Sequence, residues 1–175
     1  IDKLLFVSMN QSVDIVFTGG GTAGHVLPNV RLINDLKKEG FSCAYIGSRT
    51  GPEFKLTSNL DLPFKSISCG KLRRYFSFQN FLDLFKIIIG IIQAIVILFR
   101  IKPKIIFSKG GFVSFPVVFA AWLNRIPVIL HESDLTPGLA NRLSLPFCTE
   151  VCTSFAGTAS FLKTSKTIHF TGLPI

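Results

Sequence analysis

The strongest pattern in the sequence is Val13-Asp-Ile-Val-Phe-Thr-Gly-Gly-Gly-Thr-Ala-Gly-His25, a short β-branched run that ends abruptly in glycines. Apolar residues at helical spacing follow, and the series closes at Gly40, a residue type that often ends helices. The apolar positions are Val26, Val30, Ile33 and Leu36. The pattern predicts a strand over 13–17, a glycine-rich loop and a helix over 26–39.

The same alternation of strand and helix continues along the chain. Further strands are predicted over 43–47, 64–68, 104–108, 128–131, 150–153 and 167–170, and helices over 52–59, 78–100, 115–124, 139–145 and 158–162. Strands that alternate with helices form right-handed crossovers and a parallel sheet covered on both faces. We therefore expect a doubly wound, mostly parallel α/β sheet of about seven strands.

The composition fits one folded domain. The chain has 175 residues, of which 48% are hydrophobic and 17% charged. This balance supplies apolar material for a core and excludes disordered and collagen-like classes. The only methionine is Met9, which suggests that residues 1–8 precede the natural start. We expect residues 1–12 to be a tag or disordered lead and residues 13–175 to form the domain.

Neither a membrane span nor a metal site is expected. The longest apolar run, residues 87–99, has 13 residues, whereas a helix needs about 20 to cross a bilayer. No secretory signal is recognisable at the start of the sequence. The cysteines, Cys43, Cys69, Cys148 and Cys152, lack zinc-ligand spacing, so we expect free thiols and no metal.

The first glycine loop predicts an anion-binding site. Glycines let the backbone approach an anion closely, and the following helix presents unpaired N–H groups and a positive dipole end. The residues expected to contact a phosphate are Gly20, Gly21, Thr22, Ala23 and Gly24. His25, at the start of the helix, is the first candidate for a general base. A tight turn with only a capping role is the alternative.

A second strand, glycine loop and helix follow at residues 108–116, where Lys109 adds a positive charge. The residues predicted to bind substrate or phosphate here are Gly110, Gly111, Phe112, Val113 and Ser114. In open parallel sheets, ligands bind at the carboxyl ends of the strands. Two glycine loops at neighbouring strand ends therefore predict a phosphate site with two walls.

A third candidate segment follows the strand predicted over 128–131. His131, Glu132, Asp134 and Asn141 bring an imidazole, two carboxylates and an amide to the same rim. Glu132 is the second candidate for a general base, and Asp134 and Asn141 are predicted to contact substrate. Because Asp and Ser before a proline are also ordinary turn residues, a buried structural His with loop caps is the alternative.

Cations and aromatic residues interleave over residues 71–85. The predicted membrane contacts are Lys71, Arg73, Arg74, Tyr75, Phe76, Phe78, Phe81 and Phe85. This mixture suits an anionic membrane surface, and the net charge of +9 adds attraction. Nucleic-acid binding and a merely solvated face are the alternatives. The apolar helix that follows favours the membrane, so no nucleic-acid partner is expected.

The spacing Gly19-x-Gly21-x-x-Gly24 also fits a dinucleotide-binding fold. An NAD site needs an acidic residue at the end of the second strand. That place holds Gly47-Ser-Arg49, so NAD is disfavoured. An NADP-binding reductase domain, with Arg49 at the 2′-phosphate, remains as an alternative.

Six motifs occur in order along the chain: Thr18-Gly-Gly-Gly-Thr-Ala-Gly-His25, Ile46-Gly-Ser-Arg-Thr-Gly-Pro-Glu53, Gly110-Gly-Phe-Val-Ser114, Pro127-Val-Ile-Leu-His-Glu-Ser-Asp134, Pro137-Gly-Leu-Ala-Asn-Arg142 and Thr171-Gly-Leu-Pro174. Their order and spacing resemble the MurG family of GT-B glycosyltransferases, over nearly all of residues 13–174. The sequence departs from the usual family pattern at Asp134, which replaces an amide, and at Leu173, which replaces Asn or Ser.

The resemblance implies the amino-terminal, acceptor-side half of an enzyme with two Rossmann-like domains that face a cleft. It implies inverting transfer of N-acetylglucosamine from UDP-N-acetylglucosamine (UDP-GlcNAc) to lipid I, which gives lipid II in peptidoglycan synthesis, with no metal or other cofactor. It also implies peripheral binding at the cytoplasmic face of the cell membrane. With a second, donor-binding domain absent, the chain is expected to be inactive alone. A non-catalytic membrane subunit of a split glycosyltransferase is the alternative.

Overall fold

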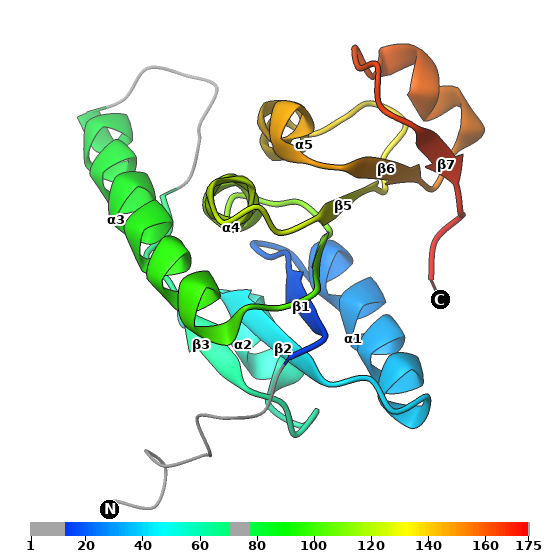
Figure 1. Ribbon diagram of the computed structural model, residues 1–175. Coiled ribbons are helices and arrows are strands. Elements are labelled where there is room, and N and C mark those ends of the chain that lie inside the picture. Colours follow the sequence, from blue (N-terminus) through cyan, green and yellow to red (C-terminus); the bar gives the residue numbers. More distant parts are fainter. Residues whose placement is uncertain (1–12, 71–77, 175) are drawn as a thin grey trace, which may run out of the picture.

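The fold is built on a seven-stranded sheet in which every neighbouring pair of strands is parallel (Figure 1). The structure is a computed structural model that describes residues 13–70 and 78–174. The strands are β1 Ile15–Thr18, β2 Cys43–Gly47, β3 Phe64–Ser66, β4 Ile105–Ser108, β5 Val128–Glu132, β6 Glu150–Thr153 and β7 Ile168–Phe170. The predicted doubly wound α/β sheet is confirmed, and the expected lead over 1–12 lies outside the described residues.

The strand order is β3-β2-β1-β4-β5-β6-β7. The chain builds outward from β1 to β3, then returns to the other side of β1 to begin β4. This reversal makes β1 and β4 the topological switch point, where doubly wound sheets bind ligands outside the carboxyl ends of the strands. The two glycine loops follow β1 and β4, so the topology places them side by side.

Helices cover both faces of the sheet (Figure 1). They are α1 Ala23–Lys38, α2 Pro52–Thr57, α3 Phe78–Ile101, α4 Ser114–Leu123 and α5 Leu139–Ser144, with 3₁₀ helices η1 Leu145–Phe147 and η2 Ala156–Phe161. Neighbouring β1 residues Val16 and Phe17 are both buried but belong to different core clusters. Because successive side chains of a strand point to opposite faces, the sheet separates two apolar cores.

Two predicted helices differ in detail from the observed ones. Helix α1 begins three residues earlier than expected, at Ala23, because its first turn is formed by the end of the glycine loop rather than by apolar residues. The segment predicted as a helix over 158–162 is the 3₁₀ helix η2. Short 3₁₀ turns are frequent as connectors.

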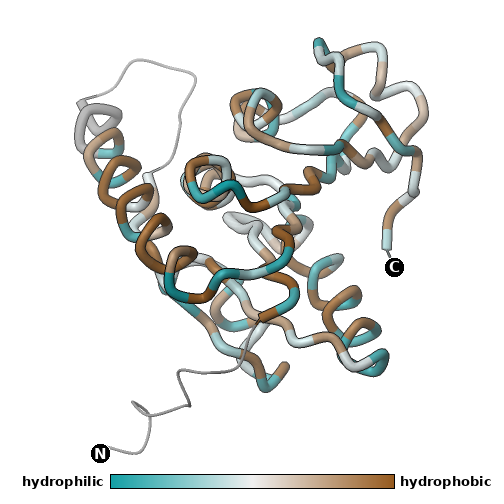
Figure 2. The backbone as a smooth tube through the Cα atoms, in the orientation of Figure 1, coloured by the Kyte–Doolittle hydropathy of each residue, from teal (hydrophilic) through white to brown (hydrophobic). Residues whose placement is uncertain are grey.

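Helix α3 is long and strongly apolar along its length (Figure 2). Its stretch Asp83–Ile101 has a mean hydropathy of 2.4 and is long and apolar enough to cross a membrane by length and composition. The expectation of no membrane span was based on the unbroken apolar run of residues 87–99, and it stays a prediction. One face of α3, with Ile87, Ala94 and Leu98, is buried in the domain, and α3 packs against α4.

Candidate functional site

The two glycine loops touch each other at the carboxyl edge of the sheet. The N–H of Gly20 donates to the carbonyl of Gly110 over 3.2 Å. A Cβ on Gly111 would overlap the carbonyl oxygen of Gly20, and one on Gly21 would overlap the ring of Phe112. Both Gly21 and Gly111 also have positive φ angles, of 88° and 84°. Only glycine allows this backbone course and this close approach.

The open part of the first loop is the N-terminus of α1. Thr22, Ala23 and Gly24 are exposed, and the first N–H groups of a helix have no partner within it. No acidic residue lies in this first turn, so no charge on it offsets the positive end of the helix dipole. Since the N–H groups of Gly20 and Gly21 bond inside the domain, the anion-binding capacity of this loop is concentrated at Thr22–Gly24.

A buried carboxylate that was not singled out from the sequence supports the first loop from inside the domain. Glu53, on α2, is fully buried, and it accepts the N–H of Gly21 over 3.2 Å and that of Ser48 over 2.9 Å. A Cβ on Gly20 or Gly51 would collide with this carboxylate. Two signals were available: Glu53 ends the second of the six motifs, and it lies in the first turn of a helix that begins at Pro52.

His25 is half-buried beside the open turn, with its Nδ1 atom 2.8 Å from Oγ1 of Thr22. Burial lowers the pKa of His25 from 6.5, although the carboxylates of Glu132 and Asp134 raise it. The charge of Lys109 lowers it further. The ring is therefore neutral at physiological pH. If Nδ1 carries the proton and donates it to Thr22, the lone pair on Nε2 is free to accept a proton.

Lys109 is fully buried and joins the ends of β4 and β5. Its ammonium donates to Nδ1 of His131 over 2.8 Å and also bonds Oγ of Ser133. The proton of His131 is then on Nε2, which donates to the carbonyl of Gly172 over 3.0 Å. Burial and the nearby Lys109 charge lower the pKa of His131 to about 4, and burial lowers that of Lys109 to about 8. Lys109 thus points into the domain rather than at an open anion site, contrary to the expectation from sequence.

Glu132 organises the loop after β5. It is buried, and its two oxygens accept the N–H groups of Asp134 and Gly138 and the side-chain amide of Asn141, over 2.8 to 3.0 Å. Asp134 itself is exposed. Because these three contacts direct both carboxylate oxygens toward groups of its own loop and of α5, they fit a role for Glu132 in positioning that loop.

The predicted binding residues divide by burial. Among them, Gly21, Thr22, Ala23, Gly24, Gly111, Phe112 and Asp134 are exposed or partly exposed, whereas Gly20, Gly110, Val113, Ser114 and Asn141 are buried. Ser114 donates its hydroxyl to the carbonyl of Gly111 over 2.7 Å. Asn141 packs under Gly110, where a Cβ would clash with its amide. The buried residues support the loops from inside, and direct ligand contact by them stays a prediction.

Most of the predicted membrane contacts cannot be placed. Lys71, Arg73, Arg74, Tyr75 and Phe76 lie outside the described residues. Phe78 and Phe81 belong to α3. Phe85 is 51% exposed, in a row of exposed apolar side chains along that helix: Leu84, Phe85, Ile88, Ile89, Ile92, Val96 and Phe99.

A parallel Rossmann-like domain with glycine loops converging at its switch point is the building unit of GT-B glycosyltransferases. The chain belongs to the glycosyltransferase family 28 N-terminal domain family, whose profile matches residues 15–153. This match argues against the NADP-binding reductase domain. The Glu53 carboxylate argues against it as well, because it accepts the N–H of Gly21 that the diphosphate of a dinucleotide would need.

Two similar proteins share one name. The chain is 57% identical over 165 residues to a Legionella pneumophila (strain Lens) protein and 55% identical over 161 residues to a Clostridium kluyveri one. Both are named UDP-N-acetylglucosamine–N-acetylmuramyl-(pentapeptide) pyrophosphoryl-undecaprenol N-acetylglucosamine transferase. The alignments cover 94% and 92% of this chain but only 46% and 45% of those proteins. The chain therefore spans less than half the length of these relatives.

Solved structures agree on the fold. The crystal structure of MurG from Acinetobacter baumannii superposes with a TM-score of 0.74 at 25% identity, over 93% of this chain and 46% of that one. A UDP-GlcNAc 2-epimerase from Neisseria meningitidis superposes with a TM-score of 0.65 at 16% identity, over 94% of this chain and 47% of that one. The second likeness concerns the fold alone.

Proposed function

We propose that this chain is the acceptor-side domain of an inverting glycosyltransferase that moves N-acetylglucosamine from UDP-GlcNAc to lipid I, forming lipid II. The observation that carries the proposal is the convergence of His25, the open N-terminus of α1 and the second glycine loop at one edge of the sheet. The names of the relatives supply the donor and the lipid-linked acceptor. Turnover requires a second, donor-binding domain.

His25 acts as the general base of this reaction. The acceptor hydroxyl attacks the anomeric carbon, its proton passes to Nε2 of His25, and the bond from that carbon to UDP breaks with its electron pair leaving on UDP. Thr22 fixes the orientation of the ring, because its Oγ1 accepts a hydrogen bond from the Nδ1–H of His25 over 2.8 Å. The charges of Glu132 and Asp134 raise the pKa of His25 and so stabilise the imidazolium that forms.

The phosphate groups are held by backbone dipoles. The acceptor diphosphate lies at the exposed N–H groups of Thr22–Gly24, where the helix dipole favours negative charge. Fixed dipoles and cations can also stabilise charge that develops on a leaving UDP. The reaction is therefore proposed to proceed without a metal, and a chelator should leave turnover unchanged.

The test is a chimera in which this chain replaces the matching residues of the Legionella relative, assayed for transfer of labelled N-acetylglucosamine to lipid I. We expect activity, and a loss of roughly 10²–10⁴-fold in His25→Ala, the usual range for a general base. Because the pKa of His25 is lowered, turnover should hold from neutral pH to below 6.5 and fall as the ring is protonated.

Thr22 provides the control for tautomer fixation. Thr22→Val should lower kcat about fivefold, the equivalent of a hydrogen bond worth about 1 kcal/mol, while Thr22→Ser keeps the hydroxyl and the rate. A folded chimera that lacks transferase activity would refute the assignment. Near-normal turnover in His25→Ala would instead refute only the role of His25 as the general base.

The same proposal places the protein peripherally on the cytoplasmic face of the cell membrane, with α3 against the lipid. One side of α3 is buried in the domain, and apolar side chains are exposed on it from Leu84 to Phe99. Exposed apolar surface of this extent marks an interaction site. The helix is thus proposed to lie along the bilayer surface.

Vesicle flotation tests this surface. The chain should float with phosphatidylglycerol vesicles at low salt. The double variant Ile88→Ser, Ile92→Ser should bind at least about tenfold more weakly, because each side chain is about half exposed and contributes roughly 1 kcal/mol when that exposed part is buried. Phe41→Ser, an exposed apolar residue after α1, serves as the control. Equal flotation of both variants, or none in the parent chain, would contradict the membrane proposal.

A further inference from the structure

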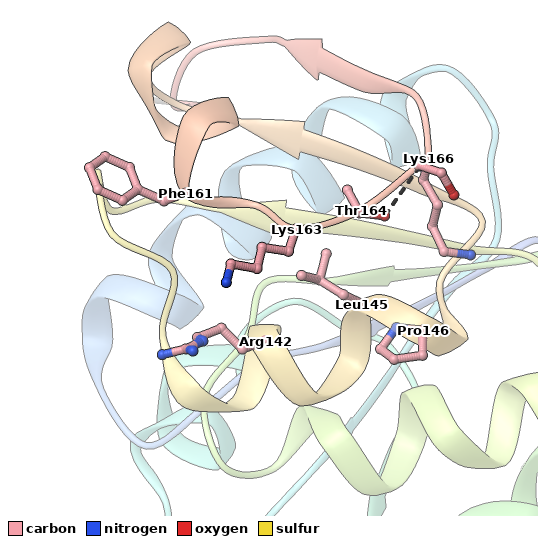
Figure 3. Close-up of a pocket in the computed structure, with 8 residues that line it drawn as sticks. Arg142, Leu145, Pro146, Phe161, Lys163, Thr164 and Lys166 are labelled. Atoms are coloured by element: carbon pink, nitrogen blue, oxygen red, sulfur yellow. Dashed lines mark hydrogen bonds between the residues drawn. The ribbon is translucent and has the colours of Figure 1, made fainter.

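A basic cavity lies apart from the glycine loops, between α5 with η1 and the segment that returns from η2 to β7 (Figure 3). Its volume is about 590 Å³, within the range of small-molecule sites, roughly 300–1,000 Å³. None of the glycine-loop residues, nor any residue from 131 to 138, lines it.

The cavity wall carries cations and no carboxylate. Arg142 on α5 and Lys163 after η2 extend into the same space from opposite sides (Figure 3). Both are exposed, and neither forms an ion pair with any of the residues that the structure describes. Lys166 also lines the cavity, but its ammonium bonds the carbonyl of Cys148. Two unbalanced positive charges that share a hollow attract an anion.

The rest of the wall combines apolar side chains with the hydroxyl-bearing residues Thr164 and Ser165. Leu145 and Pro146 form one side, and Phe161, 52% exposed, lies at the edge. A second cavity of about 350 Å³ shares Pro146 and Lys166 and continues to Trp122 and Phe147. A purely inorganic anion would leave the apolar side chains exposed to water, whereas a ligand with an anionic group and an apolar group would cover them.

We infer that this cavity binds an organic phosphate, with the phosphate between Arg142 and Lys163 and the apolar body on Leu145 and Pro146. Guanidinium groups bind phosphate oxygens in a two-pronged manner, and an ammonium adds a compact charge. The phosphate comes either from a soluble ester or from the headgroup of an anionic lipid. This site is additional to the proposed transfer reaction, and neither depends on the other.

The first arm of the test is an NMR titration of the isotope-labelled chain with phenyl phosphate and with inorganic phosphate. We expect saturable shifts at residues 142–146 and 161–166, and weaker binding of inorganic phosphate. Arg142→Gln and Lys163→Gln should each weaken phenyl phosphate binding about tenfold or more, since each removes a charged hydrogen bond. Lys65→Gln, at an exposed lysine on the opposite edge strand β3, should leave binding unchanged.

The second arm measures binding to phosphatidylglycerol vesicles. If Arg142→Gln and Lys163→Gln reduce vesicle binding while phenyl phosphate fails to bind, the phosphate belongs to a lipid headgroup. Saturable phenyl phosphate binding with unchanged vesicle binding identifies a soluble ester. Because both side chains are exposed, the variants should fold, which circular dichroism verifies. The inference is overturned if neither ligand responds to these substitutions, whatever the chimera shows about transfer.

Discussion

Both glycine loops connect a strand to a helix, but they differ in which of their residues are exposed to solvent. The first ends in the exposed turn Thr22–Gly24, whereas in the second Gly110, Val113 and Ser114 are buried. The first rests on the carboxylate of Glu53, the second on the amide of Asn141. The first loop leaves an exposed turn at the start of a helix, whereas most of the second loop is packed inside the domain.

This difference shows that a glycine in a binding loop can serve either the ligand or the packing. Gly111 lies where a side chain would strike the backbone of the first loop, and Gly24 lies where a side chain would meet nothing closer than 3.8 Å. The sequence alone treats the two positions as equivalent. Substitutions separate them.

The largest effect is expected for Gly111→Ala. An alanine with φ near 84° costs about 1–2 kcal/mol, and the overlap of its Cβ with the Gly20 carbonyl adds about 1–3 kcal/mol of overpacking. The free energy of unfolding, measured by urea denaturation, should fall by this sum, and chimera activity should be lost with the loop contact.

Gly40→Ala is the matched control. Gly40 has a φ of 90°, but a Cβ added there would meet no heavy atom within 4 Å. Its substitution should therefore cost only the backbone strain. If Gly111→Ala and Gly40→Ala lower the free energy of unfolding equally, the close approach of the two loops does not contribute to stability.

A smaller loss is expected for Glu53→Gln, which keeps the shape of the side chain but replaces one acceptor oxygen with a donor. The new amide would face the N–H of Gly21 or Ser48, leaving one buried donor unsatisfied at a cost of about 1–3 kcal/mol. The urea midpoint should fall, and KM for the acceptor should rise more than kcat falls. Glu39→Gln, at an exposed glutamate, should change neither. An unaltered midpoint in Glu53→Gln would contradict the supporting role.

The fold followed from the sequence because its signals are local. Buried strands such as β2, all five of whose residues are buried, read as continuous apolar runs, and each helix shows its own spacing. The parallel topology then brings the loops after β1 and β4 together without further information. The placement of His25 at the start of α1 follows from the same logic.

The buried contacts of the site could not be predicted from the sequence, because they join residues that are far apart along the chain. Glu53 reaches back 32 positions to Gly21, and Lys109 reaches forward 22 positions to His131. A lysine after a strand and before glycines suggests an anion contact, and only the packing shows that this ammonium is directed into the domain. The burial of Asn141 and its hydrogen bond to Glu132 likewise come from packing that its sequence context does not reveal.

The smallest structural effect is expected for Gly24→Ala, and it tests the exposed loop directly. Gly24 lies in the first turn of α1 without a positive φ, and its nearest neighbour would be Oγ1 of Thr22 at 3.8 Å. Alanine is favoured over glycine in helices by up to about 1 kcal/mol, so stability should stay equal or rise slightly. If the diphosphate approaches this backbone closely, the added methyl group should raise KM for lipid I in the chimera by several-fold while the urea midpoint holds. A rise in stability with unchanged KM would show that the ligand does not approach Gly24, and the exposed turn would then differ from the second loop only in its solvent contact.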